Sequence, residues 1–186
     1  RIAWDYLLEY TRPLDAKANI AELRVDFMGR RINLYGADNP DSLRGIYLDG
    51  CVLDEIGNIN PTLFTEIVRP ALADRLGYCV AMGTPKGQNH FKDLRDRGLN
   101  SDGWELLEFK SSDTKILDKD ELIAAKAEMG DDKYQQEFEC SFNAPVEGSY
   151  YSSIINDLDE QEHIIDIPKD ELARTYTGWD LGISDS

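Results

Sequence analysis

The chain has 186 residues, which is enough to bury one hydrophobic core or the parts of two. Its residues are 41% hydrophobic and 30% charged, which is typical of a folded globular protein and excludes disordered and fibrous classes. The net charge of −16 argues against broad nonspecific binding to nucleic acid, because Lys and Arg supply that affinity by neutralising phosphates, so any DNA contact is expected to be local.

A solvated acidic surface is the simpler explanation of this charge. No apolar run approaches the roughly 18 residues that span a bilayer, and the chain does not open on a leader peptide, so we expect a soluble, unsecreted protein. The three widely spaced cysteines, Cys51, Cys79 and Cys140, fit a reducing cytoplasm. The two histidines, His90 and His163, are expected at the surface, and neither a zinc site nor Ser-His-Asp chemistry is indicated.

The first part of the chain predicts a helix followed by a β-hairpin. Residues 2–8 are typical of the end of an amphipathic helix, and the polar stretch 11–19 should interrupt it. Residues 20–28 and 31–35 are short β-prone runs joined by a glycine turn. Residues 36–42 are dense in turn-forming residues and predict a loop.

A strand and a helix are predicted next. Residues 46–53 form an apolar strand, and residues 61–74 form a helix with Asn60 as its N-cap. Pro70 should kink this helix near its end. The apolar face of the helix is made by Leu63, Phe64, Ile67, Val68, Ala71 and Leu72.

Two further strands complete the predicted sheet. They occupy residues 78–82 and 104–109, with a helix over residues 89–97 between them. Strands that alternate with helices through short connections predict an α/β fold with a doubly wound, mostly parallel sheet. Ligands bind such sheets at the carboxyl ends of the strands, so the residues that follow each strand are the candidates for chemistry.

The last third of the chain is less regular. Residues 120–129 and 133–140 predict two helices, and residues 143–148 have the composition of a domain exit. Residues 155–167 are acidic and weakly periodic, as in a linker. Residues 175–182 are β-prone and contain a carboxylate.

The strand predicted over residues 46–53 is followed directly by Asp54 and Glu55. Two carboxylates at the end of a buried strand are typical of a Walker B motif, in which the first holds Mg²⁺ and the second orients and deprotonates the attacking water. Taken alone the pattern is weak, because many apolar strands end in acidic residues at the solvent boundary.

The next strand is followed by Gly83, Thr84, Pro85, Lys86 and Gly87. The glycines allow the backbone to approach a ligand closely, and the Thr84 hydroxyl can sense a terminal phosphate. A simple Gly-Pro turn is the alternative. The position of this segment favours function, because it should lie beside Asp54 and Glu55.

These motifs together resemble those of the ATPase domain of phage large terminase subunits. The matching segments are residues 36–45, 53–55, 69–72 and 83–87, in the order and spacing of that family. The resemblance implies a P-loop ATPase fold of the ASCE type that binds ATP and Mg²⁺, with Asp54 as a metal ligand, Glu55 as the catalytic carboxylate, and Gly83 and Thr84 as a coupling motif.

Arg44 matches a family position proposed as an arginine finger, which stabilises transition-state charge across a subunit boundary. A structural salt bridge within the loop is the alternative for Arg44, and the sequence leaves both open.

The tail of the chain extends the resemblance. Residues 142–151 are similar to the family's exit from the ATPase domain, and residues 178–182 resemble the first strand of its RNase H-like nuclease. Asp180 is thereby implied as a ligand of Mg²⁺ or Mn²⁺ in DNA cleavage. The predicted organisation is residues 1–145 as ATPase, 146–172 as linker and 173–186 as the start of the nuclease.

The implied function is ATP-driven translocation of double-stranded DNA into a capsid. The implied partners are the small terminase subunit and the portal protein, with a homo-oligomeric ring, no membrane, and the host cytoplasm as location. The chain contains no Gly-x-x-x-x-Gly-Lys-Ser/Thr element, so we expect a fragment, truncated at both ends, that is inactive by itself. The alternatives are a helicase-type translocase and a non-catalytic phage-derived assembly domain.

Overall fold

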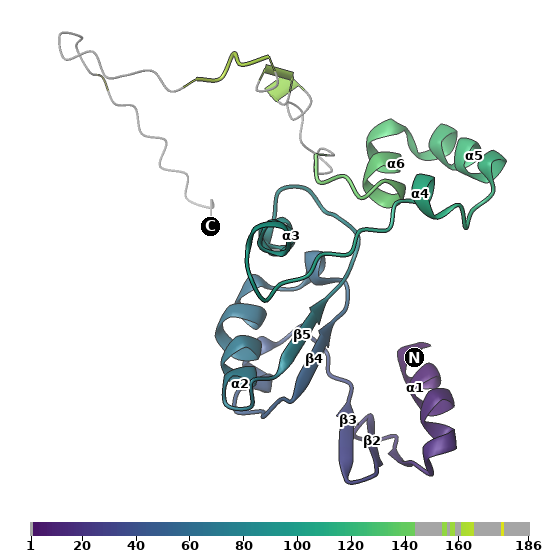
Figure 1. Ribbon diagram of the computed structural model, residues 1–186, viewed down its shortest axis with the longest axis vertical. Helices are drawn as coiled ribbons and strands as arrows, with labels where there is room; N and C mark the ends of the chain where they lie inside the picture. Colours follow the sequence, from purple (N-terminus) through teal and green to yellow (C-terminus); the bar gives the residue numbers. More distant parts are fainter. Residues whose placement is uncertain (1, 144–153, 156, 159–160, 166–175, 177–186) are drawn as a thin grey trace. The chain divides into compact units, whose positions relative to one another are not determined.

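The computed structural model describes residues 2–143, 154–155, 157–158, 161–165 and 176. The contacts within the chain divide it into two units, Arg1–Ala144 and Pro145–Ser186. The description below concerns the first unit, which contains the segments drawn with helix and strand labels (Figure 1). Asp180, the predicted nuclease ligand, and the predicted nuclease strand around it lie outside the described residues.

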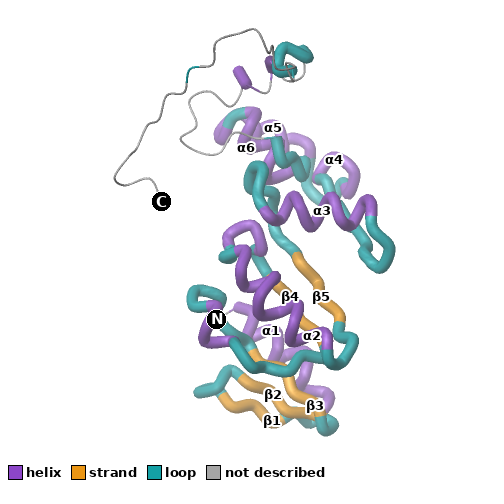
Figure 2. Tube along the Cα trace, turned by 90° about the vertical axis from the view of Figure 1, so that its left-hand side faces the viewer, coloured by secondary structure: helices purple, strands orange, loops and turns teal. Residues whose placement is uncertain are grey.

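The N-terminal part of the chain is a helix packed on a three-stranded antiparallel sheet (Figure 2). The predicted helix and hairpin are confirmed, but an additional strand lies within the stretch predicted as a polar break, where it pairs with the first strand of the hairpin. Val25, which is fully buried, forms the centre of this small core. The elements are α1 (Ile2–Thr11), β1 (Lys17–Asn19), β2 (Arg24–Phe27) and β3 (Arg30–Asn33).

The two strands β4 (Gly50–Leu53) and β5 (Tyr78–Ala81) pair in parallel, so the predicted parallel strand pair is confirmed. The first of them is shorter than predicted, because residues 46–49 have no strand beside them. Leu48 instead donates its backbone N–H to the carbonyl of Ala71, and the ladder begins where Gly50 meets Tyr78.

The predicted helix over residues 61–74 is present, with a widened middle. Asn60 caps it, since its Oδ1 accepts the N–H of Thr62 at 3.0 Å. The turns η4 (Leu63–Val68) are π-helical and lead into α2 (Arg69–Ala73). Pro70 lacks an N–H and sits just after this wider stretch, a local distortion of the kind that proline causes.

One hydrophobic core joins this helix to one face of the strand pair. Its buried members come from both elements and from the flanking loops, and Cys51, Cys79 and Ala81 pack against them from the strands. The apolar helix face predicted from the sequence supplies most of the core. The buried members are Leu43, Leu53, Ile56, Leu63, Phe64, Ile67, Val68, Leu72 and Leu94.

Helix α3 (His90–Asn100) follows β5 and is confirmed, with Asn89 as its N-cap. The strand predicted over residues 104–109 is wrong: within residues 2–143 that segment pairs with no strand. Side chains hold it instead, because Trp104 packs edge-on against Phe64 at 6.3 Å between ring centroids and Arg95 forms an ion pair with Glu108 at 2.9 Å. Aromatic and apolar residues give a segment β-propensity, but they do not supply a ladder partner.

The two helices predicted near residue 130 are confirmed, the second beginning two residues earlier than predicted. Asp118 caps the first by accepting the N–H of Asp120 at 2.8 Å. The elements are α4 (Ser111–Thr114), α5 (Lys119–Met129) and α6 (Asp131–Phe138), and α5 contacts α6.

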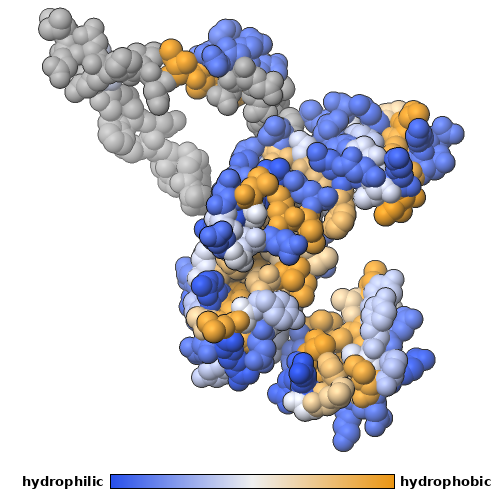
Figure 3. Space-filling view, viewed as in Figure 1, coloured by the Kyte–Doolittle hydropathy of each residue, from blue (hydrophilic) through white to orange (hydrophobic). Residues whose placement is uncertain are grey.

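The second face of the β4–β5 pair is uncovered in the described part of the chain. Val52, Tyr78, Val80 and Met82 are exposed there by 60%, 67%, 45% and 48%. Figure 3 shows hydrophobic residues among hydrophilic ones at the surface around these strands. The α/β class is therefore observed, whereas a doubly wound sheet, with helices on both faces, is not.

Among the described residues, none of the helices has the length and apolar character needed to cross a membrane.

Candidate functional site

The turns that follow β4 and β5 lie against each other at one edge of the strand pair. The ladder continues past both strands, because Met82 donates its N–H to the carbonyl of Leu53 at 2.9 Å and Ile56 donates its N–H to the carbonyl of Met82 at 3.0 Å. The residues predicted to act together at the carboxyl ends of adjacent strands are thus held in neighbouring turns.

Asp54 and Glu55 are both exposed in the turn after β4. Glu55 has left-handed backbone angles, φ 52° and ψ 43°, which are uncommon for a residue with a side chain. Asp54 supports this turn, since its Oδ1 accepts the N–H of Glu55 at 3.1 Å. Such conformations persist where the surroundings enforce them, and they concentrate at functional sites.

Gly83 makes the close approach that the sequence suggested for it. A Cβ atom on Gly83 would lie 3.2 Å from the Cα of Glu55 and 3.3 Å from the nitrogen of Ile56. A side chain at Gly83 would therefore require the backbone of Glu55 and Ile56 to shift by a few tenths of an ångström. Thr84 is half-buried in the same turn, and its carbonyl oxygen lies 3.4 Å from where a Cβ of Gly57 would stand.

A polar chain links Glu55 to the turn after β5. Lys86 donates its Nζ to the Oδ1 of Asn58 at 2.6 Å, and the Asn58 Nδ2 donates to the Oε2 of Glu55 at 3.5 Å. Neither Asn58 nor Lys86 is among the site residues predicted from the sequence. The position of Lys86, three residues after Gly83, is the one signal that could have indicated it.

The start of α3 clamps the turn that carries Glu55. The Asn89 Nδ2 donates to the carbonyl of Gly57 at 3.1 Å, while its Oδ1 accepts the N–H of Phe91 at 3.0 Å. His90 places its Nε2 2.8 Å from the carbonyl oxygen of Ile56, so Nε2 must carry the hydrogen. His90 is half-buried, and its ring is hydrogen-bonded to the turn that carries Glu55. His163, by contrast, is exposed as predicted.

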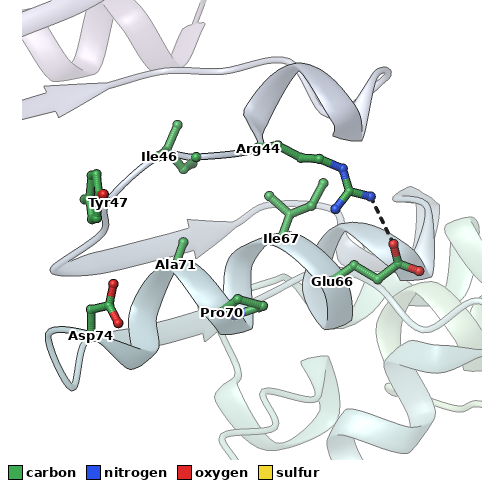
Figure 4. A pocket seen from close by; sticks show the side chains of 9 residues that line it. Arg44, Ile46, Tyr47, Glu66, Ile67, Pro70, Ala71 and Asp74 are labelled. Atoms are coloured by element: carbon green, nitrogen blue, oxygen red, sulfur yellow. Dashed lines mark hydrogen bonds and ion pairs between the residues drawn. The ribbon is translucent and has the colours of Figure 1, made fainter.

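Arg44 lines a shallow groove of about 260 Å³ between the loop before β4 and the helix of η4 and α2 (Figure 4). Its guanidinium forms ion pairs with Asp41 at 2.7 Å and Glu66 at 3.1 Å. Hydrogen bonds and attraction from both carboxylates raise the pKa of Arg44. Arg44 is more than half exposed, and the pairing matches the structural salt bridge considered as an alternative for this residue.

Asp54 and Glu55 offer carboxylate oxygens, which are the ligands that Mg²⁺ prefers. In the part of the chain that the structure describes, no group of three or more His, Cys, Asp or Glu side chains gathers at one point to hold a metal.

No protein-family model matches the chain. Sequence relatives are large terminase subunits of phages. Those of Thermus phage G20c and Thermus virus P23-45 are each 37% identical over 85 residues, covering 46% of this chain and 16% of the relative. That of Escherichia phage T5 is 25% identical over 166 residues, covering 84% of this chain and 37% of the relative. The chain thus spans well under half the length of these proteins.

Solved structures show the same fold. The ATPase domain of the large terminase of Thermus phage P74-26 superposes with a TM-score of 0.61 at 22% identity, covering 73% of this chain and 66% of that domain. The large terminase of a second thermophilic bacteriophage, in complex with ADP, gives 0.58 at 19% identity, covering 74% of this chain and 35% of that protein. The predicted resemblance is confirmed, and the described unit has the α/β fold of these ATPase domains.

Proposed function

We propose, starting from the relationship of this chain to phage large terminase subunits, that it carries the water-activating and coupling elements of a viral DNA-packaging ATPase. The observation that carries the proposal is the close approach of the turns after β4 and β5. A Cβ atom added to Gly83 would lie only 3.2 Å from the Cα of Glu55. Backbone hydrogen bonds from Met82 to Leu53 and from Ile56 to Met82 join the two turns, so a change at a bound nucleotide would reach both.

The proposed roles follow from chemistry and exposure. Asp54 would hold Mg²⁺, which would neutralise charge on the phosphates of ATP, and Glu55 would orient and deprotonate the attacking water. Thr84 senses the terminal phosphate, and Gly83 permits the close approach of the backbone. Asn58 and Lys86 hold Glu55 from the side of the coupling turn.

Arg44 is proposed as the residue that stabilises transition-state charge on a neighbouring subunit's nucleotide. In the structure it pairs with Asp41 and Glu66 at the surface. Ion pairs between exposed side chains are weak, so this pairing is compatible with release toward a nucleotide. In this proposal the groove beside Arg44 (Figure 4) faces the subunit boundary.

The remaining parts of the proposal concern the whole motor. Asp180 would hold Mg²⁺ or Mn²⁺ in an adjoining RNase H-like nuclease that cleaves double-stranded DNA. The partners are the small terminase subunit, the portal protein and further copies of this chain in a ring, in the host cytoplasm. A doubly wound sheet belongs to the same proposal, and the uncovered apolar face of β4 and β5 supports it, since parallel sheets are normally covered on both faces.

The first test is ATP turnover by the purified chain with Mg²⁺. Because its sequence has no Gly-x-x-x-x-Gly-Lys-Ser/Thr loop to cradle the phosphates, we expect turnover close to background. Measurable turnover that Glu55→Gln abolishes would overturn the proposed inactivity and would still support the role of Glu55.

The second test is the nucleotide sequence upstream of the Arg1 codon. A reading frame that encodes a P-loop supports the motor, and the polypeptide including it should lose ATP turnover on Glu55→Gln and on Asp54→Asn. A start codon close to Arg1 would instead favour the alternative, a non-catalytic assembly domain that keeps the fold for binding.

A further inference from the structure

Two cysteines face each other across the parallel strand pair. Cys51 of β4 and Cys79 of β5 are direct partners in the ladder register. Neighbouring strands lie about 4.8 Å apart, and disulfides join residues whose Cα atoms are about 4.4 to 6.8 Å apart. The backbone spacing therefore permits a covalent link between them.

Both side chains lie on the same face of the strand pair. Each packs from the strand against the hydrophobic core, and each is half-buried rather than sealed from solvent. Because side chains alternate along a strand, the neighbours Val52 and Val80 point to the opposite, uncovered face. The two thiols consequently share one partly exposed environment beside the core.

The two thiols influence each other's ionisation. Their interaction lowers the pKa of Cys51 and raises that of Cys79, and burial adds to the rise at Cys79. The thiolate is the reactive form of cysteine, so whichever thiol of the pair reacts first has the other as its facing partner in the ladder.

The third cysteine provides an internal contrast. Cys140 lies after α6, and its thiol donates to the carbonyl oxygen of Phe109 at 3.6 Å. Burial is the main cause that raises the pKa of Cys140. Cys140 has no cysteine as a ladder partner, so it is expected to stay a free thiol when the other two react.

We propose that Cys51 and Cys79 form a dithiol modification site that closes to an intramolecular disulfide when the folded chain meets a mild two-electron oxidant. With an azodicarboxamide such as diamide, one thiolate of the pair attacks a nitrogen of the azo bond and forms a sulfur–nitrogen bond. The second thiolate then attacks that sulfur, which breaks the sulfur–nitrogen bond and releases the hydrazine. Two thiol hydrogens and two electrons pass to the oxidant, and one sulfur–sulfur bond forms.

The disulfide is expected to be readily reduced. Side chains at facing positions of parallel strands point the same way, which leaves their Cβ atoms further apart than the roughly 3.8 Å preferred in a disulfide. Strained disulfides have the more oxidising potentials, so a monothiol reductant should reopen this one. The link would fix β4 to β5 three residues before Asp54 and five before Thr84.

The test is oxidation of the purified, reduced chain with diamide, followed by thiol counting and peptide mass spectrometry. Trypsin cuts after Arg44, Arg75 and Lys86, which places the two cysteines in separate peptides. We expect the three free thiols to fall to one, with a single cross-linked peptide pair that joins Cys51 to Cys79 and disappears on mild reduction.

Three variants serve as controls. Cys140→Ser should leave the cross-linked pair unchanged, whereas Cys51→Ser and Cys79→Ser should each remove it. Three remaining thiols, a cross-link through Cys140, a dimer on a non-reducing gel, or a 51–79 link formed only in denaturant would each overturn the proposal. None of these readouts involves ATP, so the proposal stands or fails independently of the proposed function.

Discussion

The Asn89 side chain joins the start of helix α3 to the turn after β4 through two hydrogen bonds. Different substitutions of Asn89 remove one or both of these hydrogen bonds. Its Oδ1 caps α3 by accepting the N–H of Phe91 at 3.0 Å, and its Nδ2 donates to the carbonyl of Gly57 at 3.1 Å. Asn89→Ser keeps a good capping oxygen but is too short to reach Gly57. Asn89→Ala removes both bonds.

The expected losses follow from these contacts. The bond to Gly57 joins two half-buried groups, and a typical hydrogen bond contributes about 1 kcal/mol to the free energy of unfolding. Serine and asparagine are nearly equivalent N-caps, and replacing either by alanine costs about 1 kcal/mol. We therefore expect Asn89→Ser to lose about 1 kcal/mol and Asn89→Ala about 2 kcal/mol.

The assay is equilibrium urea unfolding followed by circular dichroism, together with amide hydrogen exchange in the turn after β4. The Asn58 amide, which donates to the Glu55 carbonyl at 2.9 Å, should exchange faster in both Asn89 variants. Asn100→Ser is the matched control, because Asn100 is exposed at the other end of α3. If Asn89→Ser is as stable as the unchanged chain and leaves the exchange of Asn58 unaltered, the clamp on the Glu55 turn does not exist.

Three further predictions concern the core, the close approach and an ion-pair network. Leu63→Ala should lower the free energy of unfolding, measured by urea unfolding, by about 2 to 5 kcal/mol, because Leu63 is 2% exposed. Leu76→Ala is the control: Leu76 is 94% exposed, so the free energy of unfolding should change by less than about 0.5 kcal/mol. Gly83→Ala should cost about 1 to 3 kcal/mol by overpacking against Glu55, and unchanged stability would refute the close approach. Arg31 and Arg24 lower the pKa of Asp26, so the ionised Asp26 carboxylate stabilises the fold above the ordinary carboxyl pKa, and this stabilisation is lost as the pH falls through the lowered pKa. Arg31→Ala should therefore raise the pKa of Asp26, as measured by NMR titration. An Asp26 pKa that does not change in this variant would contradict the pairing.

Elements with a strong local signal were predictable. The helix of η4 and α2 has an N-cap at Asn60 and five buried residues at helical spacing, and helix α3 has its cap at Asn89, so both were located within a few residues. The segment 104–109 was predicted wrongly as a strand, because its aromatic and apolar residues are also accommodated in a segment held by the contacts of Trp104 and Arg95. A strand requires a partner, and the partner is not written in the segment itself.

Some residues of the candidate site were predicted from the sequence, and others were found only in the structure. Asp54, Glu55, Gly83 and Thr84 were identified because the carboxyl ends of parallel strands carry ligand-binding residues, and that rule needs only the order of strands. The sequence did not indicate three further residues of the site, Asn58, Asn89 and His90. Each of them forms a hydrogen bond with a residue about 30 positions away, and such long-range bonds leave no pattern in the sequence. Whether the identified residues perform their proposed roles stays a prediction.

The sequence by itself determined the helix of η4 and α2, the helix α3, the parallel pairing of β4 with β5, and the carboxylates that follow β4, because hydrophobic periodicity and capping are local properties of the chain. Tertiary structure alone decided that Glu55 adopts a left-handed conformation, that Gly83 lies against it, and that Cys51 faces Cys79. The register of two strands and the approach of two turns depend on how distant segments pack, which local periodicity does not specify.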